Sequence, residues 1–522
     1  MASQSVTAGK ELAARIDRMT IEDLVGERLM IGLSGAALTD ADVRVFRDTR
    51  AAGLILYRRN FEGPAALATL LDSLEGALGR RLLVATDHEG GRIVMLGTGT
   101  TIFPDNLAMG TAGEEAFAFR QGEIEARELR RLGIDLNLGP CLDVLTERYS
   151  PNIGIRSYGK DPRVVSRYGV ARIKGMARGG LSACAKHFPG KGHSPLDAHL
   201  KLPTIDSTPE EMRAIHLPPF VDAMAAGIDA IMTSHPVYPK LDPSGVPATF
   251  SRRLVGDWVR GELAFGGVIV SDDLEMGAVS EACPIGEAAV RTAAAGHDLL
   301  LVCHTEPAQR AAAAALVEAY RSGRLSVAEG EAAAERVRRL RLRRDKRREG
   351  GSPAPEIDGR PLAQAVATRA VTEVGREPAD LKRALNGRVT VVFPRFSDLA
   401  PRITIEPEIA DERGWIAGAF GAAGIAPQAV VVGIEPKPEE IATAAEQAAA
   451  ADATVLFLFD AHLYASNRAL LEALQARARR LAVVLLRDPY DAALLAPGVR
   501  GLTAYGFRKC QLDAVVARLT HP

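Results

Sequence analysis

Short apolar runs alternate with longer amphipathic stretches between residues 28 and 303. The runs are RLMIGLS (28–34), AGLILY (52–57), RLLVATD (81–87), GIDLNLGP (133–140), LSACAKH (181–187), IDAIMTSH (228–235), GGVIVSDD (266–273) and HDLLLVC (297–303). Several of them are almost continuously apolar, which is typical of parallel strands covered on both faces. Eight strand–helix units in fewer than 350 residues predict an α/β fold of the (β/α)8 TIM-barrel type.

The pattern changes near residues 345–360, where DKRREGGSPAPEIDGRP is first charged and then rich in Gly, Ser and Pro. Such a composition is typical of a linker. Apolar runs return from Val389 onwards, separated in part by Ala-rich helical segments. We therefore expect a catalytic barrel at 1–344, a linker at 345–360 and a smaller αβ sandwich domain at 361–522.

Many of the apolar runs end in polar residues. Asp87 ends the third run, Lys186 and His187 the fifth, His235 the sixth, and Asp272 with its neighbour Asp273 the seventh. The carboxyl ends of the strands of such a barrel meet at one mouth, where active sites lie. These side chains are therefore candidates for one functional site.

One loop concentrates titratable groups. KHFPGKGHSPLDAHLKLP (186–203) places His187, His193 and His199 six residues apart, among glycines and prolines. A zinc site made of these histidines and Asp197 is an alternative. Six-residue spacings match neither the helical pair at i, i+4 nor the short spacings of zinc fingers. We expect no metal and no cofactor.

Composition narrows the class of protein. Charged residues make up 25% of the 522 residues and the net charge is −1, so we expect no nucleic-acid partner. The Arg-rich run 336–348 fits a helix with a solvated basic face. The N-terminus lacks an apolar signal core, no run is long enough to span a membrane, and the five cysteines are scattered, so we expect a cytoplasmic protein with free thiols. The sequence carries no signal for the oligomeric state, and a monomer is the default expectation.

Four motifs identify a resemblance to a known family. They are TDHEGGR (86–92), RSYG (156–159), KHFPGKGHSPLDAH (186–199) and VIVSDDLEM (268–276), and they occur in the family's order. The sequence resembles glycoside hydrolase family 3, and within it the bacterial β-N-acetylglucosaminidases that recycle cell-wall fragments.

The resemblance implies a retaining mechanism in two steps. Asp272 matches the nucleophile, and because neighbouring strand residues point to opposite faces, Asp273 would be directed elsewhere. The general acid/base would be His199, oriented by Asp197 on a loop able to open and close. The substrate-binding side chains implied by the same motifs, together with His235 by its position at the mouth, are Asp87, Arg156, Lys186, His187 and His235.

Two departures from the family pattern concern the same site. Met95 replaces a second arginine found in many relatives, and Lys191 with His193 changes the charge of the loop. We predict an exo-acting β-N-acetylglucosaminidase whose partner is a small amino-sugar glycoside, such as a muropeptide fragment. A phosphorylase that yields a sugar 1-phosphate, and a sugar-binding module without turnover, are the alternatives.

Overall fold

The computed structural model describes residues 19–146, 150, 152–194, 202–349, 357–375 and 381–520. By its internal contacts the chain divides into two compact units. The first contains residues up to 87, 125–153 and 161–356, and the second contains 88–124, 154–160 and 357 onwards. The predicted domain limits therefore stay a prediction, because two stretches of the barrel sequence group with the C-terminal part of the chain.

An eight-stranded parallel sheet forms the first unit and confirms the predicted barrel. Each of the eight apolar runs contains one strand. The strands are β1 (Leu29–Gly32), β2 (Gly53–Leu56), β3 (Leu83–Thr86), β6 (Leu136–Asn137), β7 (Ser182–Phe188), β8 (Ala230–Thr233), β9 (Val268–Val270) and β10 (Leu300–Val302). Their order is β10-β1-β2-β3-β6-β7-β8-β9. A parallel bridge between Val270, the last residue of β9, and Leu299, the residue before β10, links the two ends of this sheet.

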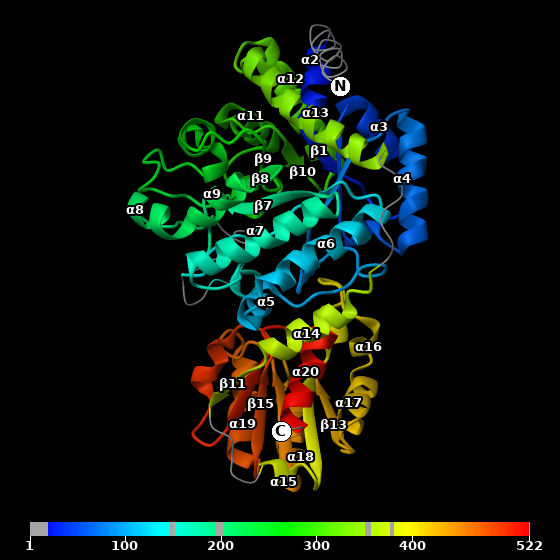
Figure 1. Cartoon of the computed structure of the whole chain (residues 1–522), viewed down its shortest axis with the longest axis vertical. Coiled ribbons are helices and arrows are strands. Elements are labelled where there is room, and N and C mark those ends of the chain that lie inside the picture. Colours follow the sequence, from blue (N-terminus) through cyan, green and yellow to red (C-terminus); the bar gives the residue numbers. More distant parts are fainter. Residues whose placement is uncertain are drawn as a thin grey trace. The chain divides into compact units, whose positions relative to one another are not determined.

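Helices follow the strands and surround them, as Figure 1 shows for the blue-to-green part of the chain. They are α2 (Ile21–Glu27), α3 (Asp40–Thr49), α4 (Pro64–Leu78), α6 (Glu115–Arg131), α7 (Pro162–Arg178), α9 (Pro218–Ala225), the π-helix η5 (Arg253–Glu262), α11 (Ile285–Ala295), α12 (Glu306–Arg321) and α13 (Val327–Glu349). Local sequence sets their ends. Thr39 and Asp42 form a reciprocal capping box at the start of α3, and α4 begins with a proline and ends at Gly79 in the left-handed conformation.

The barrel interior is a packed core. Met30, Ile55, Leu83 and Leu136 are buried in one cluster with residues of the other strands. Val337 and Leu340 of α13 join this cluster, so the Arg-rich run forms the predicted helix. Several of its arginines do not form a solvated face but pair with acids of the barrel, as Arg341 does with Glu27.

The second unit contains a six-stranded sheet, drawn from yellow to red in Figure 1, and confirms the predicted second αβ domain. Its strands are β12 (Val389–Pro394), β13 (Gln428–Val432), β14 (Ala453–Leu458), β15 (Leu481–Leu485) and β16 (Arg500–Thr503), all parallel, with β11 (Thr372–Gly375) antiparallel to β16. The helices of this unit include α5 (Asn106–Ala112), α14 (Arg360–Ala370), α15 (Leu381–Ala384), α16 (Pro407–Ala410), α17 (Glu412–Gly421), α18 (Pro438–Ala450), α19 (Ala465–Arg477) and α20 (Lys509–Thr520).

Alternate residues of these strands enter two different cores. Val455 and Phe457 of β14 pack with α17 and α20, whereas Leu456 and Leu458 pack with α18 and α19. The sheet is therefore covered on both faces, as its continuous apolar runs predict. No helix among the described residues of either unit has the length and apolar character needed to cross a bilayer.

Candidate active site

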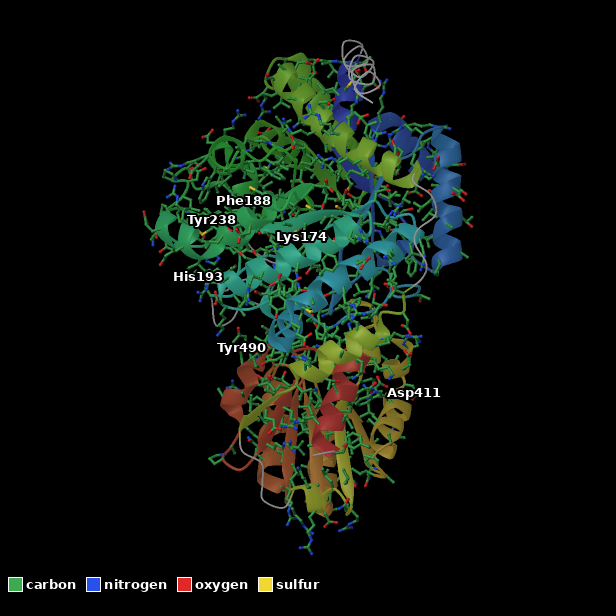
Figure 2. The ribbon with its side chains drawn as sticks, in the orientation of Figure 1. Lys174, Phe188, His193, Tyr238, Asp411 and Tyr490 are labelled. Atoms are coloured by element: carbon green, nitrogen blue, oxygen red, sulfur yellow. The ribbon has the colours of Figure 1, made fainter. Side chains whose placement is uncertain are left out.

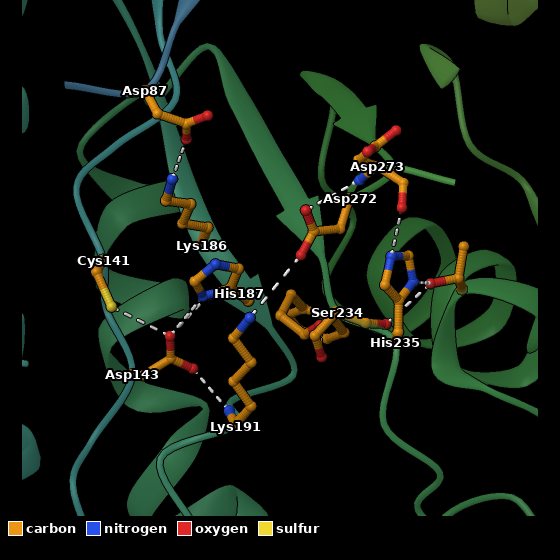
Figure 3. Close-up of polar contacts among 12 residues, drawn as sticks. Asp87, Cys141, Asp143, Lys186, His187, Lys191, Ser234, His235, Asp272 and Asp273 are labelled. Atoms are coloured by element: carbon orange, nitrogen blue, oxygen red, sulfur yellow. Dashed lines mark hydrogen bonds and ion pairs between the residues drawn. The ribbon is translucent and has the colours of Figure 1, made fainter. Parts of the chain in front are cut away.

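The polar strand ends of the barrel lie together. Asp87 follows β3, Lys186 and His187 end β7, His235 follows β8 and Asp272 follows β9. Because the strands are parallel, these positions share the carboxyl edge of the sheet, and Figure 3 shows their side chains converging there. The sequence-based grouping of these residues agrees with this geometry.

Lys186 and Asp87 form an ion pair across the mouth. The Lys186 ammonium donates a hydrogen bond to Asp87 Oδ1, and the lysine is almost completely buried. Part of the Asp87 carboxylate stays accessible. A carboxylate fixed in this way presents a charged acceptor, and charged groups make stronger hydrogen bonds to hydroxyls than neutral ones.

His187 is held by Asp143, a residue that sequence reasoning missed. The Nδ1 of His187 lies 2.7 Å from Asp143 Oδ2, so the ring donates from Nδ1 to the carboxylate. Asp143 also accepts the backbone N–H of Lys191 at 2.6 Å and the thiol of Cys141 at 3.2 Å. This buried carboxylate therefore orients His187 and fixes the start of the loop. Its position shortly after the fourth apolar run, three residues beyond Pro140, is the signal that could have marked it as a residue of the mouth.

Cys141, Asp143 and His187 are also close enough together to hold a metal ion. Their ligand atoms lie within 4.8 Å of one another. Both oxygens of Asp143, however, already accept protein N–H groups, Oδ1 from Lys191 and Oδ2 from His187. The donor set thus fits a hydrogen-bond network that positions His187 better than a cation site.

Asp272 lies beside a buried cation. The Nζ of Lys191 is 3.8 Å from Asp272 Oδ2, and the lysine side chain is only 3% exposed. The other oxygen, Oδ1, accepts the backbone N–H of Asp273 at 2.9 Å. The Asp272 side chain remains 17% exposed, so its carboxylate is both oriented and accessible.

Asp273 is directed to different partners. Its Oδ1 accepts the backbone N–H groups of Glu275 and Cys303, both at 3.2 Å, and its Oδ2 lies 3.1 Å from His304 Nε2. The side chain thus ties the end of β9 to the end of β10. The Asp273 carboxylate therefore contacts the chain around the end of β10, whereas the Asp272 carboxylate lies beside Lys191.

His235 uses both ring nitrogens within the protein. Its Nε2 donates to the backbone carbonyl of Asp273 at 2.9 Å, and its Nδ1 lies 2.6 Å from Thr249 Oγ1. Burial lowers the pKa of His235. The neutral ring supports the turn that carries Asp272, and its contact with substrate stays a prediction.

Arg156 belongs to the second unit and forms a bidentate ion pair there. Its Nη2 lies 2.6 Å from Glu89 Oε1 and its Nε donates to Oε2 at 2.9 Å. Asn106 Nδ2 donates to the Arg156 carbonyl at 2.7 Å. The backbone at Gly154 passes so close to Asp488 that a Cβ there would lie 2.5 Å from the Asp488 carboxylate. The chain two residues before the RSYG motif therefore passes close to the Asp488 side chain.

The first part of the histidine-rich loop is anchored to the barrel. Tyr238 donates its hydroxyl to the Gly190 carbonyl at 3.0 Å, and Gly192 passes so close to Val144 that a Cβ would lie 1.9 Å from its carbonyl oxygen. Figure 2 labels Tyr238 together with Phe188 and His193 of the same region.

The chain is anchored again beyond the loop. Val237 donates its N–H to Pro203 and accepts that of Ile205. The predicted acid/base pair, Asp197 and His199, lies between these anchors and outside the described residues.

Comparisons with known proteins agree with this geometry. The model of the glycosyl hydrolase family 3 N-terminal domain matches residues 20–340. A β-hexosaminidase of Pseudomonas aeruginosa (strain LESB58) is 38% identical over 292 residues, which cover 55% of this chain and 86% of that protein. The family match at 20–340 includes every described barrel residue of the site.

Solved structures extend the likeness to the whole chain. A glycoside hydrolase family 3 β-N-acetylglucosaminidase from Paenibacillus sp. str. FPU-7 superposes with a TM-score of 0.89 at 32% identity, covering 96% of this chain and 97% of that one. NagZ from Neisseria gonorrhoeae, solved with N-trifluoroacetyl-D-glucosamine, has a TM-score of 0.53 at 31% identity, covering 66% of this chain and 97% of that one. The nearly closed barrel, the polar residues at its strand ends, the matching family model and these relatives show that the chain belongs to glycosyl hydrolase family 3.

Proposed function

We propose that the protein is a retaining exo-β-N-acetylglucosaminidase that removes a non-reducing terminal N-acetylglucosamine from muropeptide-type or short amino-sugar glycosides in the cytoplasm. The enzyme class, a glycoside hydrolase of the β-N-acetylhexosaminidase type, agrees with the names of its curated relatives. The observation that carries the proposal is Asp272, an oriented and accessible carboxylate at the end of the seventh barrel strand.

In the first step, Asp272 attacks the anomeric carbon and forms a glycosyl ester as the bond to the leaving oxygen breaks. A carboxylate suits this role because it stabilises an oxocarbenium-like transition state before the covalent bond forms. The imidazolium of His199 gives its proton to the leaving oxygen, and Asp197 orients the ring. In the second step His199 takes a proton from water, which attacks the anomeric carbon and releases Asp272.

Chain connectivity supports a meeting of His199 with Asp272. Leu202 packs against Met276 and Ala278, and Met276 follows Asp272 by four residues. His199 precedes Leu202 by three residues, a stretch that spans at most about 11 Å when fully extended. The chain beyond the loop therefore packs beside the strand end that carries Asp272, which supports the assignment of His199.

Recognition of the sugar is assigned to the charged groups around Asp272. Asp87, held by Lys186, offers acceptors to sugar hydroxyls, and His187 is fixed by Asp143 toward the same mouth. The similar structure of NagZ was solved with N-trifluoroacetyl-D-glucosamine, a 2-acylamino sugar. This supports a 2-acylamino sugar as the substrate of the present protein. The assignment of Arg156 and His235 to substrate rests on the family motif and on strand position.

The test uses a chromogenic N-acetyl-β-D-glucosaminide. We expect Asp272→Ala to lower turnover to background and His199→Ala to lower it by about 10²–10⁴-fold. Asp273→Asn is the matched control, because the carboxylate of this neighbouring acid accepts the backbone N–H groups of Glu275 and Cys303. Added azide should restore turnover of Asp272→Gly and yield the α-glycosyl azide. Undiminished hydrolysis by Asp272→Ala would eliminate the proposed nucleophile.

Phosphorolysis is a second candidate, favoured by the buried ammonium of Lys191 beside Asp272. A cation there, with His193 on the same loop, would offset the charge of an incoming phosphate. Products formed with and without phosphate separate the two reactions: a phosphorylase releases N-acetylglucosamine 1-phosphate, and a hydrolase releases the free sugar at a rate that phosphate does not change.

A further inference from the structure

A cavity lined by several arginines lies at the opposite end of the barrel from Asp272. It has a volume of about 140 Å³ and is lined by residues that include Arg28, Arg252, Arg260 and Arg336. Arg28 immediately precedes β1, and His297 precedes β10, so the cavity lies at the amino ends of the strands. Asp272 follows the carboxyl end of β9, so this is a separate site.

Arginines outnumber the acids that pair with them at the cavity. Four guanidinium groups line it, and among the described residues two carboxylates, those of Asp298 and Glu329, form ion pairs with them. Asp298 is fully buried and is shared by Arg260 and Arg336, while Glu329 pairs with Arg252. Burial lowers the pKa of His297 to about 3, so this ring adds no charge at neutral pH.

Arg28 forms no ion pair with any of the described residues. It is 4% exposed, and it donates to the Tyr320 hydroxyl and to the His297 carbonyl at 2.6 Å, both neutral acceptors. Its Nε has no hydrogen-bond partner among the described residues. A buried charge is costly unless an opposite charge compensates it, and burial here lowers the pKa of Arg28 to about 10.

We propose that this cavity binds a small oxyanion of the phosphate or sulfate class, which compensates Arg28 and its neighbours. Guanidinium groups recognise such anions through paired N–H donors. Residues at the amino end of a barrel commonly serve stability, so the ligand stabilises the fold and takes no part in glycoside cleavage. The Arg-rich segment 336–348 thereby contributes Arg336 to a binding site.

The experiment measures thermal unfolding of the full-length protein in sodium sulfate against sodium chloride at matched ionic strength. Sulfate also stabilises proteins through exclusion from their surfaces, an effect that rises steadily with concentration. Site binding instead gives a component that saturates at millimolar sulfate, as expected for a ligand of the native state. Phosphate should reproduce this component and acetate should give a weaker one if the site prefers tetrahedral anions.

Two variants move the affinity in opposite directions. Arg28→Met should remove the saturable component, and Glu329→Gln should lower the apparent dissociation constant about threefold or more, because it deletes a competing negative charge. Glu329 is 57% exposed, so its variant keeps the inference testable if Arg28→Met does not fold. Arg163→Gln, at a surface position that pairs with Asp161, is the control and should behave as the parent.

Absence of a saturable component in the parent protein, or equal sulfate affinity in Glu329→Gln and the parent, would overturn the inference. Because the readout is unfolding, neither result bears on glycoside hydrolysis. Loss of activity in Asp272→Ala, in turn, leaves the anion site untouched.

Discussion

Lys191 offers a direct test of how the mouth of the barrel sets the ionisation of Asp272. Replacing Lys191 by Met removes the charge while keeping an unbranched side chain in a buried position. The Nζ it removes lies 3.8 Å from Asp272 Oδ2. Lys191→Arg keeps a cation and is the matched control. The backbone N–H of residue 191 still reaches Asp143 in both variants, so the loop start keeps its anchor.

The expected size of the shift in the pH profile follows from the distance between Lys191 Nζ and Asp272 Oδ2. Unit charges about 4 Å apart interact by about 1 kcal/mol in water and by about 4 kcal/mol at an effective dielectric constant of about 20. The 17% exposure of the Asp272 side chain places this pair between the two limits. Since about 1.4 kcal/mol corresponds to one pH unit, the acid limb of the kcat/KM profile should move upward by about one to two pH units in Lys191→Met.

The direction of the shift follows from the proposed role of the Asp272 carboxylate. A nucleophile must be ionised, and a nearby ammonium favours the ionised form, so its loss requires a higher pH for the same activity. The profile is measured between pH 3.5 and 9 with the chromogenic glucosaminide, on all three proteins. An acid limb at the same pH in Lys191→Met and the parent would refute the idea that Lys191 holds Asp272 ionised.

Three further outcomes follow. Asp273→Asn should lower the free energy of unfolding by about 1–3 kcal/mol, because it weakens the contacts to the end of β10, including the one to His304. Urea titration measures this free energy, and an unchanged value would contradict the prediction. Burial lowers the pKa of His216 to about 4, so the folded protein resists a proton that the unfolded chain accepts below about pH 6.5. Stability should therefore fall as pH drops from about 6.5 toward 4, and less steeply in His216→Gln; parallel melting-temperature profiles would speak against this. Gly192→Ala should cost about 1–3 kcal/mol, because its Cβ would meet the Val144 carbonyl; an unshifted melting temperature would show that the loop yields freely.

The barrel could be predicted from sequence because its strands are buried on both faces. Several of the runs are apolar almost without interruption, and that signal does not depend on knowing any partner strand. β11 gave no such signal: Thr372–Gly375 is a short edge strand in which exposed and half-buried residues alternate. Sequence reading also missed the hairpin of β4 (His88–Gly90) and β5 (Ile93–Val94), which follows the third barrel strand directly.

The candidate site was predictable as a set of residues but not as a set of contacts. Polar residues at strand ends identified Asp87, Lys186, His187 and Asp272, because parallel topology alone brings such positions together. Which of these side chains form ion pairs and hydrogen bonds with one another depends on their lengths and directions in the folded barrel. Asp143 lies 44 residues before His187 in the chain, and no local pattern marks it as the carboxylate that fixes the ring.

The grouping of residues 88–124 and 154–160 with the C-terminal sheet has a practical consequence. A truncation after residue 356 would strip these stretches of the surface on which they pack, leaving α5 without α14, a helix with which it makes extensive contact. The stretch 154–160 would also lose its contact with Asp488, whose side chain lies close to Gly154. A shortened version of the protein will need polar replacements for the apolar residues of 88–124 and 154–160. The truncation alone would expose a new apolar surface that favours aggregation.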